Sequence, residues 1–373
     1  MSTLAGRRDL RRYSRHLLIP EVGLAGQEKL ARARVLVIGA GGLGVPVLQY
    51  LAAAGVGRIG IVDDDTVDIT NLQRQVIYAT SDVGRRKVDV VAERIAALNA
   101  QVAVEAYPLR LDANNARELV RAYDLVVDAT DTFGARYLIN DAARLESKPD
   151  VYGSIFRFDG QVAVFAPNGP CYRCLFPEPP PEGSVPSCAE GGVLGVLAGI
   201  VGTWQANEAL KLILGIGEPL VGRLLLVDAL GARTREIAIE SDPHCALHGA
   251  HATIVDVADV APTAPASLTV PELEASELDA FLAANPDAIV LDVREPHEAI
   301  FGAPAGSLAL PLSQLEARMH ELDATKTYVV ACRIGTNSRW AVARLHDAGL
   351  RRLQHLRGGL LAYAVIDASF DAF

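Results

Sequence analysis

The sequence lacks an excess of positive charge and lacks a long apolar run. Its 373 residues include 35 Lys and Arg against 45 Asp and Glu, a formal net charge of −10. Nucleic acids and anionic membranes are normally bound by basic surfaces, so we expect neither as a partner. The most apolar stretch, "GGVLGVLAGIVGTW" at 191–204, is shorter than the roughly 18–20 residues that span a bilayer. It predicts a buried helix.

Aromatic residues and cysteines are also scarce. Aromatics make up 6% of the chain beside 32 glycines, a balance that suits α/β proteins with glycine-rich turns. The five cysteines are an odd number, and no apolar signal-like segment is visible in "MSTLAGRRDLRRYSRH". We therefore expect a cytoplasmic protein with reduced cysteines, which serve as metal ligands, as nucleophiles or as small buried residues.

The order of the apolar patterns predicts two α/β domains. "RVLVIGAGGLG", "VPVLQYLAAAG" and "RIGIVDDD" follow one another as strand, helix and strand, which implies a parallel sheet. Leu10–Leu30 suggests an amphipathic helix with a turn, and Asp159-Gly160 a hairpin turn. The small and proline-rich residues after 249 predict a linker, which would reach about 20–25 Å if flexible. The predicted parts are 1–249, a linker at 250–267, and 268–373.

A glycine-rich turn follows the first strand of the predicted parallel sheet. Gly39, Gly41 and Gly44 form the pattern G-x-G-x-x-G, and Asp63 ends the second strand. Such a turn brings phosphates close to the backbone at a helix N-terminus, while the acidic residue binds a ribose. Alone, the pattern favours NAD as the ligand.

Polar residues after the second strand change that expectation. They are Asp65, Asn71, Arg74, Gln75 and Lys87. A dinucleotide needs no such cations, but a triphosphate that is cleaved does, because charge develops on the leaving pyrophosphate. Asp131 ends "VVDATD" at the sheet edge where such folds bind ligands, and there it would hold Mg²⁺. The pattern therefore favours ATP.

Two short motifs, far apart in the sequence, predict a zinc site. Cys171 and Cys174 form C-x-x-C in "CYRC", and Cys245 and His248 form a second pair in "DPHCALHG". Three thiolates and one imidazole suit the tetrahedral preference of zinc, and four protein ligands indicate a structural role. His244 is an alternative fourth ligand. A redox C-x-x-C pair is the competing interpretation, but prolines rather than a helix follow it.

The two remaining cysteines lie at positions that suit nucleophiles. Cys188 precedes the long apolar helix, and helix N-termini lower the pKa of a thiol; a small buried cysteine is equally compatible with the sequence. Cys332 begins "CRIGTNSR", between an apolar strand and a helix. A turn of this kind, with Gly335 and Ser338, points backbone N–H groups at the sulfur and stabilises a thiolate or a persulfide.

Taken together, the motifs resemble a known family. "RYSRHLLIPEVGLAGQEKL", "VIGAGGLG", "DDDTVDITNLQRQ", "VGRRKV", "DATDTFGARYLIN" and "GSIFRFDGQV" are similar to the ubiquitin-activating superfamily, and most of all to its molybdopterin-synthase and thiamine-type sulfur-carrier adenylyltransferases. The likeness covers residues 10 to about 249. It implies a Rossmann-like adenylation domain in a homodimer. In this family ATP converts the C-terminal Gly-Gly carboxylate of a small β-grasp carrier into an acyl-adenylate.

The resemblance also implies residue roles. Asp63 would bind the ribose and Gly42 would approach the phosphates. Arg15 would reach across the dimer interface, and Cys188 matches the crossover-loop cysteine that attacks the acyl group or resolves an acyl disulfide. The phosphate-binding and metal-binding positions fall on Asn71, Arg74, Lys87 and Asp131. Relatives carry C-x-x-C at both halves of the zinc site, and here the last ligand is His248.

Residues 268–373 resemble a rhodanese domain. "VLDVRE", "CRIGTNSR" and "LRGGLLAYA" carry the likeness, which implies a persulfide on Cys332, loaded from thiosulfate or by a cysteine desulfurase. The usual Gly-His-Ile-Pro-Gly-Ala is "GAPAGS" here, and Asn337 stands where an arginine is common, flanked by Arg333 and Arg339. The fusion is similar to the adenylyltransferase/sulfurtransferases of molybdenum cofactor biosynthesis and tRNA thiolation.

Three other functions remain open from the sequence. The first is an NAD-dependent oxidoreductase with structural zinc. The second is a protein-conjugating activator that forms a thioester on Cys188. The third is a binding module that recognises a carrier tail without turnover. Arg74, Lys87 and Asp131 together weigh against the first and the third, since neither has a pyrophosphate to release.

Overall fold

The computed structural model describes residues 10–180, 191–259 and 271–367 of the chain. It separates into two compact units. Unit 1 contains the described residues 10–179 and 191–259, and unit 2 contains residues 271–367. Both units combine helices with a β-sheet, so the predicted α/β fold class is confirmed.

Unit 1 is built on an eight-stranded sheet in the order β3-β2-β1-β4-β5-β6-β7-β8. The first five strands in this order are parallel and the last three antiparallel. The chain changes direction across the sheet between β1 and β4, and folds of this type bind ligands where such neighbouring strands end. The strands are β1 (Arg34–Ile38), β2 (Arg58–Val62), β3 (Ala103–Tyr107), β4 (Leu125–Asp128), β5 (Asp150–Phe156), β6 (Asp159–Phe165), β7 (Arg223–Asp228) and β8 (Arg233–Ala238).

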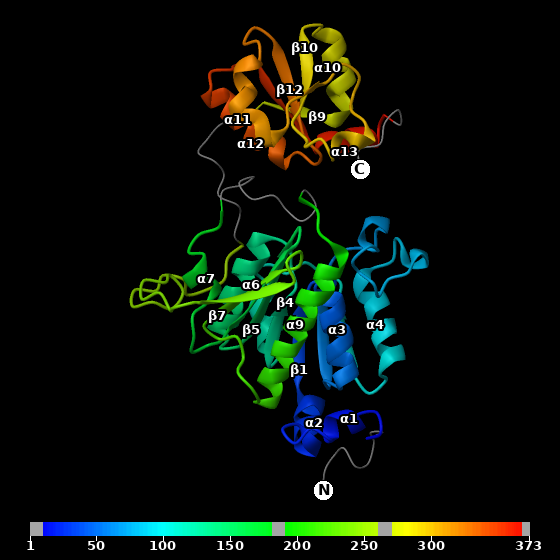
Figure 1. Cartoon of the computed structure of the whole chain (residues 1–373), viewed down its shortest axis with the longest axis vertical. Coiled ribbons are helices and arrows are strands. Elements are labelled where there is room, and N and C mark those ends of the chain that lie inside the picture. Colours follow the sequence, from blue (N-terminus) through cyan, green and yellow to red (C-terminus); the bar gives the residue numbers. More distant parts are fainter. Residues whose placement is uncertain (1–9, 181–190, 260–270, 368–373) are drawn as a thin grey trace. The chain divides into compact units, whose positions relative to one another are not determined.

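Helices cover both faces of this sheet, which is why its central strands are almost wholly apolar. Figure 1 shows α3 and α9 side by side in front of the strands and α6 behind them. On the α6 side, β1 and β4 pack against α5 and α6 in one core cluster. The helices are α3 (Gly44–Ala54), α4 (Lys87–Leu98), α5 (Ala116–Arg121), α6 (Phe133–Leu145), α7 (Tyr172–Leu175) and α9 (Gly195–Leu214), with 3-10 turns η1 (Ile69–Asn71) and η2 (Thr80–Asp82).

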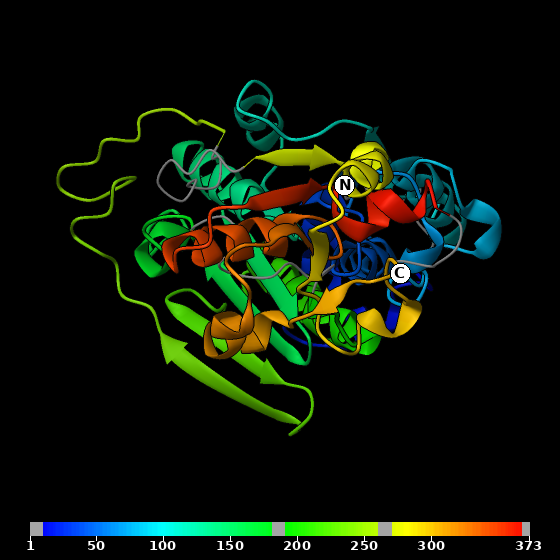
Figure 2. The same cartoon turned by 90° about the horizontal axis from the view of Figure 1, so that it is seen from above.

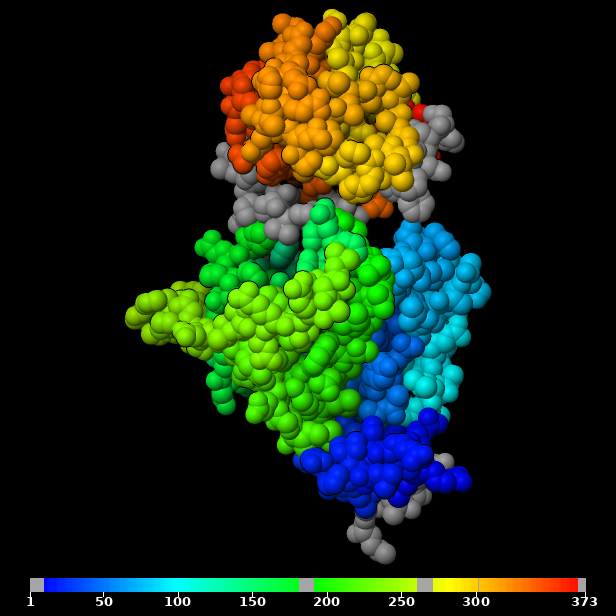
Figure 3. Space-filling model, viewed as in Figure 1, coloured from blue at the N-terminus to red at the C-terminus, as the bar shows by residue number. Residues whose placement is uncertain are grey.

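The predicted N-terminal helix is two shorter helices, α1 (Ser14–Leu17) and α2 (Gly23–Arg32). They lie at the end of unit 1 from which β1 starts, where their dark blue atoms are visible in Figure 3. Asn99, at the C-terminal end of α4, donates to the Tyr13 hydroxyl at 2.9 Å. The amide of Gly57 donates to the carbonyl of Leu30 at 2.9 Å.

The prediction of a turn at Asp159-Gly160 is wrong. Phe156 pairs with Asp159, so the two-residue turn is Arg157-Phe158, and Arg157 takes a φ of 53°. Gly160 is inside β6. A Cβ there would come within 2.4 Å of Val201 on α9, so this position of the strand requires a glycine. The last two strands, β7 and β8, form a hairpin at the antiparallel edge of the sheet (Figure 2).

Residues 250–259, the first part of the predicted linker, pack on unit 1. Ile254 lies against the buried cluster of Cys171, Cys245 and Leu247. Further on, Asp256 forms an ion pair with Arg117 at 2.9 Å. The reach calculated for a fully flexible linker therefore does not apply to this part of the chain.

Unit 2 is a five-stranded parallel sheet in the order β11-β10-β12-β13-β9. Apolar clusters fill both of its faces. Its strands are β9 (Glu272–Glu274), β10 (Ala288–Asp292), β11 (Leu308–Ala309), β12 (Thr327–Ala331) and β13 (Leu353–Arg357). Its helices are α10 (Leu278–Ala284), α11 (Leu315–Arg318), α12 (Thr336–Asp347) and α13 (Gly359–Ala364). In the described part of the chain, no helix combines the length and apolar character that crossing a membrane requires.

Candidate functional site

The glycine turn after β1 depends on two of its glycines for its shape. Gly39 has a φ of 98°, and a Cβ there would lie 2.7 Å from the carbonyl oxygen of Ala129. A Cβ on Gly44 would lie 1.9 Å from the carbonyl oxygen of Gly39. Larger residues would therefore open the turn and push α3 away from β1.

Two residues from the loop after β2 lie over this turn. A Cβ on Gly42 would be 3.4 Å from the Arg74 side chain, and one on Gly41 would be 3.7 Å from Nε2 of Gln75. Gln75 is 3% exposed, and its Oε1 has no hydrogen-bond partner among the described residues. The structure thus brings the predicted turn together with Arg74 and Gln75.

Asp63 is bound to the same turn. Its carboxylate accepts from the amide of Ala40 at 2.8 Å and from that of Asp65 at 2.9 Å. Burial raises the pKa of Asp63, and the nearby charge of Lys87 opposes that rise. Tyr78 donates its hydroxyl to the Ala40 carbonyl at 2.7 Å and so holds the turn in place. No sequence motif singled out this residue.

Lys87 supplies a buried positive charge at this edge. It begins α4, is 5% exposed, and donates to the exposed carboxylate of Asp65 at 2.7 Å. Asn71 uses its Oδ1 to accept from the amide of Asp68 at 3.1 Å, which shapes the η1 turn. A phosphate in place of the Asp65 carboxylate would pair with the ammonium group of Lys87, which is already buried.

Asp131 is exposed just after β4. The preceding Asp128 is buried, and its Oδ1 accepts from both the amide and the hydroxyl of Thr130, at 2.9 and 2.7 Å. Gln205 of α9 donates to the Asp128 carbonyl at 2.6 Å. Asp128 therefore shapes the turn that presents Asp131. This role of Asp128 was not predicted from the sequence, although "DATD" displays both acids.

One predicted catalytic residue, Arg15, does not lie at this edge. Arg15 is exposed on α1, at the opposite end of α3 from the glycine turn. The eleven residues of α3 span about 16 Å at 1.5 Å per residue, so Arg15 does not reach the turn of its own chain. Cys188 lies outside the described residues.

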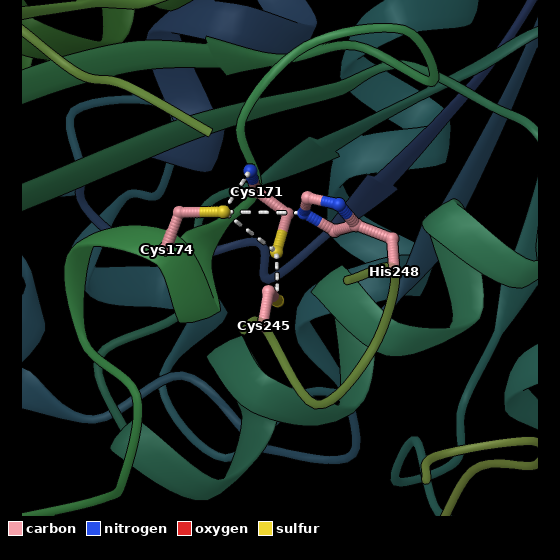
Figure 4. A group of neighbouring side chains, drawn as sticks. All are labelled: Cys171, Cys174, Cys245 and His248. Atoms are coloured by element: carbon pink, nitrogen blue, oxygen red, sulfur yellow. Dashed lines mark hydrogen bonds between the residues drawn. The ribbon is translucent and has the colours of Figure 1, made fainter. Parts of the chain in front are cut away.

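Figure 4 shows Cys171, Cys174, Cys245 and His248 pointing toward one another. Their candidate ligand atoms all lie within 4.8 Å of one another. The sulfurs of Cys171 and Cys174 are 3.9 Å apart, those of Cys171 and Cys245 3.6 Å, and the Cys174 sulfur lies 3.1 Å from His248 Nε2. Tetrahedral zinc with bonds of about 2.3 Å to sulfur would separate its sulfurs by about 3.8 Å. The four side chains could therefore hold a metal ion.

The alternative ligand His244 is exposed and is not part of this cluster. The sequence also predicted no helix beside "CYRC", whereas the structure forms one helical turn, α7, with Cys171 as its N-cap. Two contacts fix this turn on α6. The amide of Tyr172 donates to Asn140 at 2.8 Å, and Arg173 pairs with Asp141 at 2.7 Å.

Burial within the cluster disfavours charge on its own side chains. Burial raises the pKa of Cys171, and the thiols of Cys174 and Cys245 raise it further. Burial, together with the charge of Arg144, lowers the pKa of His248, which keeps the imidazole neutral. A neutral imidazole is ready to bind a metal, and a cation is what buried thiolates require.

Cys332 lies in unit 2, directly after β12, and is 2% exposed. The amide of Gly335 donates to its sulfur at 3.1 Å. Burial raises the pKa of Cys332, while hydrogen bonds from Ser338, Gly335 and Ile334 act in the opposite direction. The backbone donors expected at this turn therefore face the sulfur.

Cys332 packs in an apolar cluster, and β10, the strand beside β12, ends in a buried ion pair. Asp292 and Arg294 form a buried ion pair at 2.7 Å, and Arg294 also donates to the carbonyl of Gly302 at 2.6 Å. This bond ties the atypical "GAPAGS" loop to β10. His355, which no sequence motif singled out, lies beside this turn, with its Nε2 2.7 Å from the Gly335 carbonyl. The only signal in the sequence is a histidine just before a Gly-Gly pair in "LQHLRGG".

Comparison with known proteins finds a different family model for each of the two units. A ThiF family model matches residues 13–247, and a rhodanese-like domain model matches residues 274–365. The chain is 57% identical over 257 residues to a Thermus thermophilus protein named "Sulfur carrier protein adenylyltransferase"; the match covers 67% of this chain and 95% of that protein. It is 46% identical over 372 residues to "Probable adenylyltransferase/sulfurtransferase MoeZ" of Mycobacterium tuberculosis, covering 96% and 93% of the two chains.

A solved structure supports the fold of unit 1. MccB of E. coli, crystallised with MccA-N7isoASN, superimposes with a TM-score of 0.59 at 22% identity, covering 65% of this chain and 76% of that one. The resemblance predicted from the sequence motifs is confirmed. The chain belongs to the ThiF family, and its second unit is a rhodanese-like domain.

Proposed function

We propose that this chain uses ATP to adenylylate a small sulfur-carrier protein and then replaces one oxygen of the activated carboxylate with sulfur. The carrier would be a β-grasp protein that ends in Gly-Gly. One observation carries the proposal: a nucleotide-type turn with a buried lysine and a cysteine with backbone donors occur on one chain, and that chain aligns over 372 residues with a relative named for both activities. The name of the Thermus relative supports the carrier as substrate.

The geometry of unit 1 suits ATP bound at the glycine turn. Asp63 would bind the ribose, and the phosphates would approach Gly42 at the N-terminal end of α3. The phosphate-binding side chains would be Asn71, Arg74, Gln75 and Lys87, with Asp65 released from Lys87. Mg²⁺, held by Asp131, would neutralise charge on the phosphates. Positive groups at this edge favour adenylylation because charge develops on the departing pyrophosphate.

The sulfur step would start at Cys332. Its thiolate attacks the outer sulfur of thiosulfate, sulfite leaves, and a persulfide forms. The terminal sulfur then attacks the acyl carbon of the adenylate, the bond to AMP breaks, and an acyl disulfide results. A second thiol, for which we propose Cys188, attacks the Cys332 sulfur and releases the carrier thiocarboxylate. The resulting disulfide would be reduced by the thiols of the cytoplasm, where we place the protein.

We propose zinc as the metal of the four-residue cluster. Three thiolates and one imidazole suit its tetrahedral coordination. Because four protein side chains fill that coordination, zinc there would hold α7 and the loop after β8 together and would not touch substrate. A cysteine desulfurase is the alternative sulfur donor to thiosulfate.

The homodimer is proposed from the position of Arg15, which does not reach the glycine turn of its own chain. In a two-fold dimer, Arg15 of one chain would complete the nucleotide site of the other.

Mixing the Arg15→Ala variant with the Asp131→Asn variant tests this shared site. If each variant alone is inactive, heterodimers contain one intact site of two, and the mixture regains about a quarter of wild-type pyrophosphate exchange. Arg12→Ala, on the same exposed segment, is the matched control. Absence of any recovery would contradict the shared site.

The overall proposal is tested by incubating the protein with ATP, Mg²⁺, thiosulfate and each candidate Gly-Gly carrier. Intact mass spectrometry should show the carrier about 16 Da heavier, because sulfur replaces oxygen. Asp131→Asn should block ATP–pyrophosphate exchange, while Cys332→Ala should block only the mass shift. Failure of every carrier to support exchange would reject adenylylation. A shift that survives Cys332→Ala but not Cys188→Ala would indicate a thioester on Cys188 instead.

A further inference from the structure

We propose that His355 is a positioning residue for Cys332, because it holds Gly335 so that the Gly335 amide points at the cysteine sulfur. The inference rests on the proposed role of Cys332 as the sulfur carrier. His355 is in the middle of β13, which pairs with β12 in parallel, and Val330 is its partner in the register. Cys332 follows only two residues after Val330.

Gly335 is fixed from both of its ends. Its amide donates to the Cys332 sulfur at 3.1 Å, and its carbonyl accepts from His355 at 2.7 Å and from the Ser338 hydroxyl at 2.9 Å. Its φ of 99° is a conformation that other residues rarely adopt. A backbone in this region is held by its surroundings, and His355 supplies one of the two side-chain contacts to the carbonyl.

The contact with the Gly335 carbonyl shows which ring nitrogen of His355 carries a proton. A carbonyl oxygen only accepts, so Nε2 of His355 must be the donor. The other nitrogen, Nδ1, lies 3.8 Å from the Glu272 carboxylate on β9. Glu272 in turn pairs with Arg339 on α12. The charged groups on the Nδ1 side of the ring therefore include Glu272 and, paired with it, Arg339.

The burial of His355 argues against an incidental contact. The residue is 3% exposed, in a sheet whose other inward side chains are mostly apolar. A buried polar ring is costly unless its polar atoms are bonded. A leucine at this position would pack in the same core without that cost. A bond to Gly335, whose amide donates to the reactive sulfur, explains the histidine.

The test is alkylation of Cys332 in the whole protein by iodoacetamide, followed by mass spectrometry of the Cys332 peptide across pH. We expect His355→Leu to raise the pH midpoint of alkylation by about one unit, so that the rate near pH 8 falls about tenfold. The plateau rate at high pH should not change, because the thiolate itself is the same. His355→Gln, which keeps a donor near the Gly335 carbonyl, should return the rate to within about twofold of wild type.

A merely structural effect would change the result in the opposite direction. If His355→Leu only loosened unit 2, the buried Cys332 would become more accessible and alkylation would become faster. Unchanged or faster alkylation in His355→Leu, or failure of His355→Gln to restore the slower variant, would overturn the inference.

A second pair of variants tests the Glu272 side of the ring. Glu272→Gln removes the charge beside Nδ1, and Glu274→Gln is its match, because Glu274 is on the same strand and pairs with Arg357. If Glu272 orients the ring, Glu272→Gln should slow alkylation near pH 8 about threefold, and Glu274→Gln should change nothing. Loss of a negative charge acting directly on Cys332 would instead favour the thiolate, so faster alkylation would contradict an orienting role. Equal rates in the two variants would remove Glu272 from the proposal.

The proposed function and this inference fail differently. Treatment of the wild-type protein with thiosulfate should add one sulfur to the Cys332 peptide. If neither thiosulfate nor a cysteine desulfurase adds a sulfur, the role of Cys332 as a sulfur carrier is rejected, yet the alkylation profiles still decide whether His355 positions the thiol. If sulfur is added and the profiles of wild type and His355→Leu coincide, only the inference is rejected.

Discussion

The two groups of buried cysteines differ in what surrounds their sulfur atoms. Cys171 lies among other thiols, which together with burial raise its pKa. Burial also raises the pKa of Cys332, but its hydrogen-bond donors include the Gly335 amide, and these oppose the rise. The first site becomes favourable for thiolates only with a cation, whereas the second carries its own donors.

This difference separates structure from reactivity. A thiolate bound to zinc donates its electron pair to the metal and is a poor nucleophile. Zinc with four protein ligands also has no open position for substrate. A thiolate held by backbone N–H groups keeps a lone pair available for attack. Metal removal should therefore damage unit 1 and spare Cys332, and changes at Cys332 should spare the metal.

The largest expected effect is that of Cys332→Ala on sulfur transfer. The variant should form less than about 1% of the wild-type carrier thiocarboxylate, because it lacks the nucleophile. Its ATP–pyrophosphate exchange and its metal content should remain at wild-type levels. Carrier mass spectrometry, exchange of labelled pyrophosphate and elemental analysis measure the three quantities. A loss of metal in Cys332→Ala would break the comparison.

Cys174→Ser should have the converse effect. Loss of a ligand from a buried metal site costs on the order of 3 kcal/mol, which lowers the melting temperature of a unit of this size by roughly 6–12 °C. Calorimetry should show the earlier transition for unit 1, and a chelator should reproduce it in the wild type. The alkylation profile of Cys332 should not change. If metal content remains full, Cys174 is not a ligand.

The sequence predicted much of both sites because their residues lie in short local motifs. Gly39 and Gly44 are forced by the turn itself, and the C-x-x-C and C-x-x-H spacings display the four residues of the candidate metal cluster. The parallel strands were also visible as apolar runs. What it predicted wrongly was the β5–β6 turn, because Asp-Gly usually marks a hairpin, and here Gly160 is required for the close approach of Val201.

The supporting residues could not be predicted, because their partners are distant in sequence. His355 contacts Gly335 twenty residues away, and Gln205 reaches the Asp128 carbonyl across 77 positions. Tyr78 supports the glycine turn through a single hydroxyl. None of these belongs to a periodic pattern. Only the fold brings them to the residues that they support.

The raised pKa of Cys332 predicts a pH dependence specific to unit 2. The folded state holds this thiol proton more tightly than the unfolded chain does. The protonated thiol therefore stabilises unit 2 fully below the pKa of the unfolded chain, near 8.5. This contribution to the free energy of unfolding is lost as the pH rises through the pKa of the folded state. Between about pH 8 and 10 the melting temperature of unit 2 should fall by a few degrees more in wild type than in Cys332→Ala. Parallel curves would show that burial does not hold the proton.

The smallest effect concerns the ion pairs beside the metal cluster. Hydrogen bonds from Arg121 and then Arg117 lower the pKa of Glu146 to about 2. Its stabilising contribution is therefore present above about pH 4.5 and is lost as pH falls toward 2. Since Arg121 is largely exposed, Glu146→Gln should cost only about 1 kcal/mol at pH 7, roughly 2–4 °C in the melting of unit 1.

Metal-depleted protein is the right material for this pH series, because the cluster would lose its metal in acid and obscure the difference. In it, the gap between wild type and Glu146→Gln should narrow below about pH 4.5 and close as the pH approaches 2. Glu28→Gln, which removes an exposed i,i+4 pair with Arg32, should show almost no gap at any pH. At pH 7 the metal content of Glu146→Gln should equal that of wild type, since a bound cation, and not the neighbouring ion pairs, holds the thiolates. Metal loss in this variant would mean that the surrounding charges also hold the cluster together.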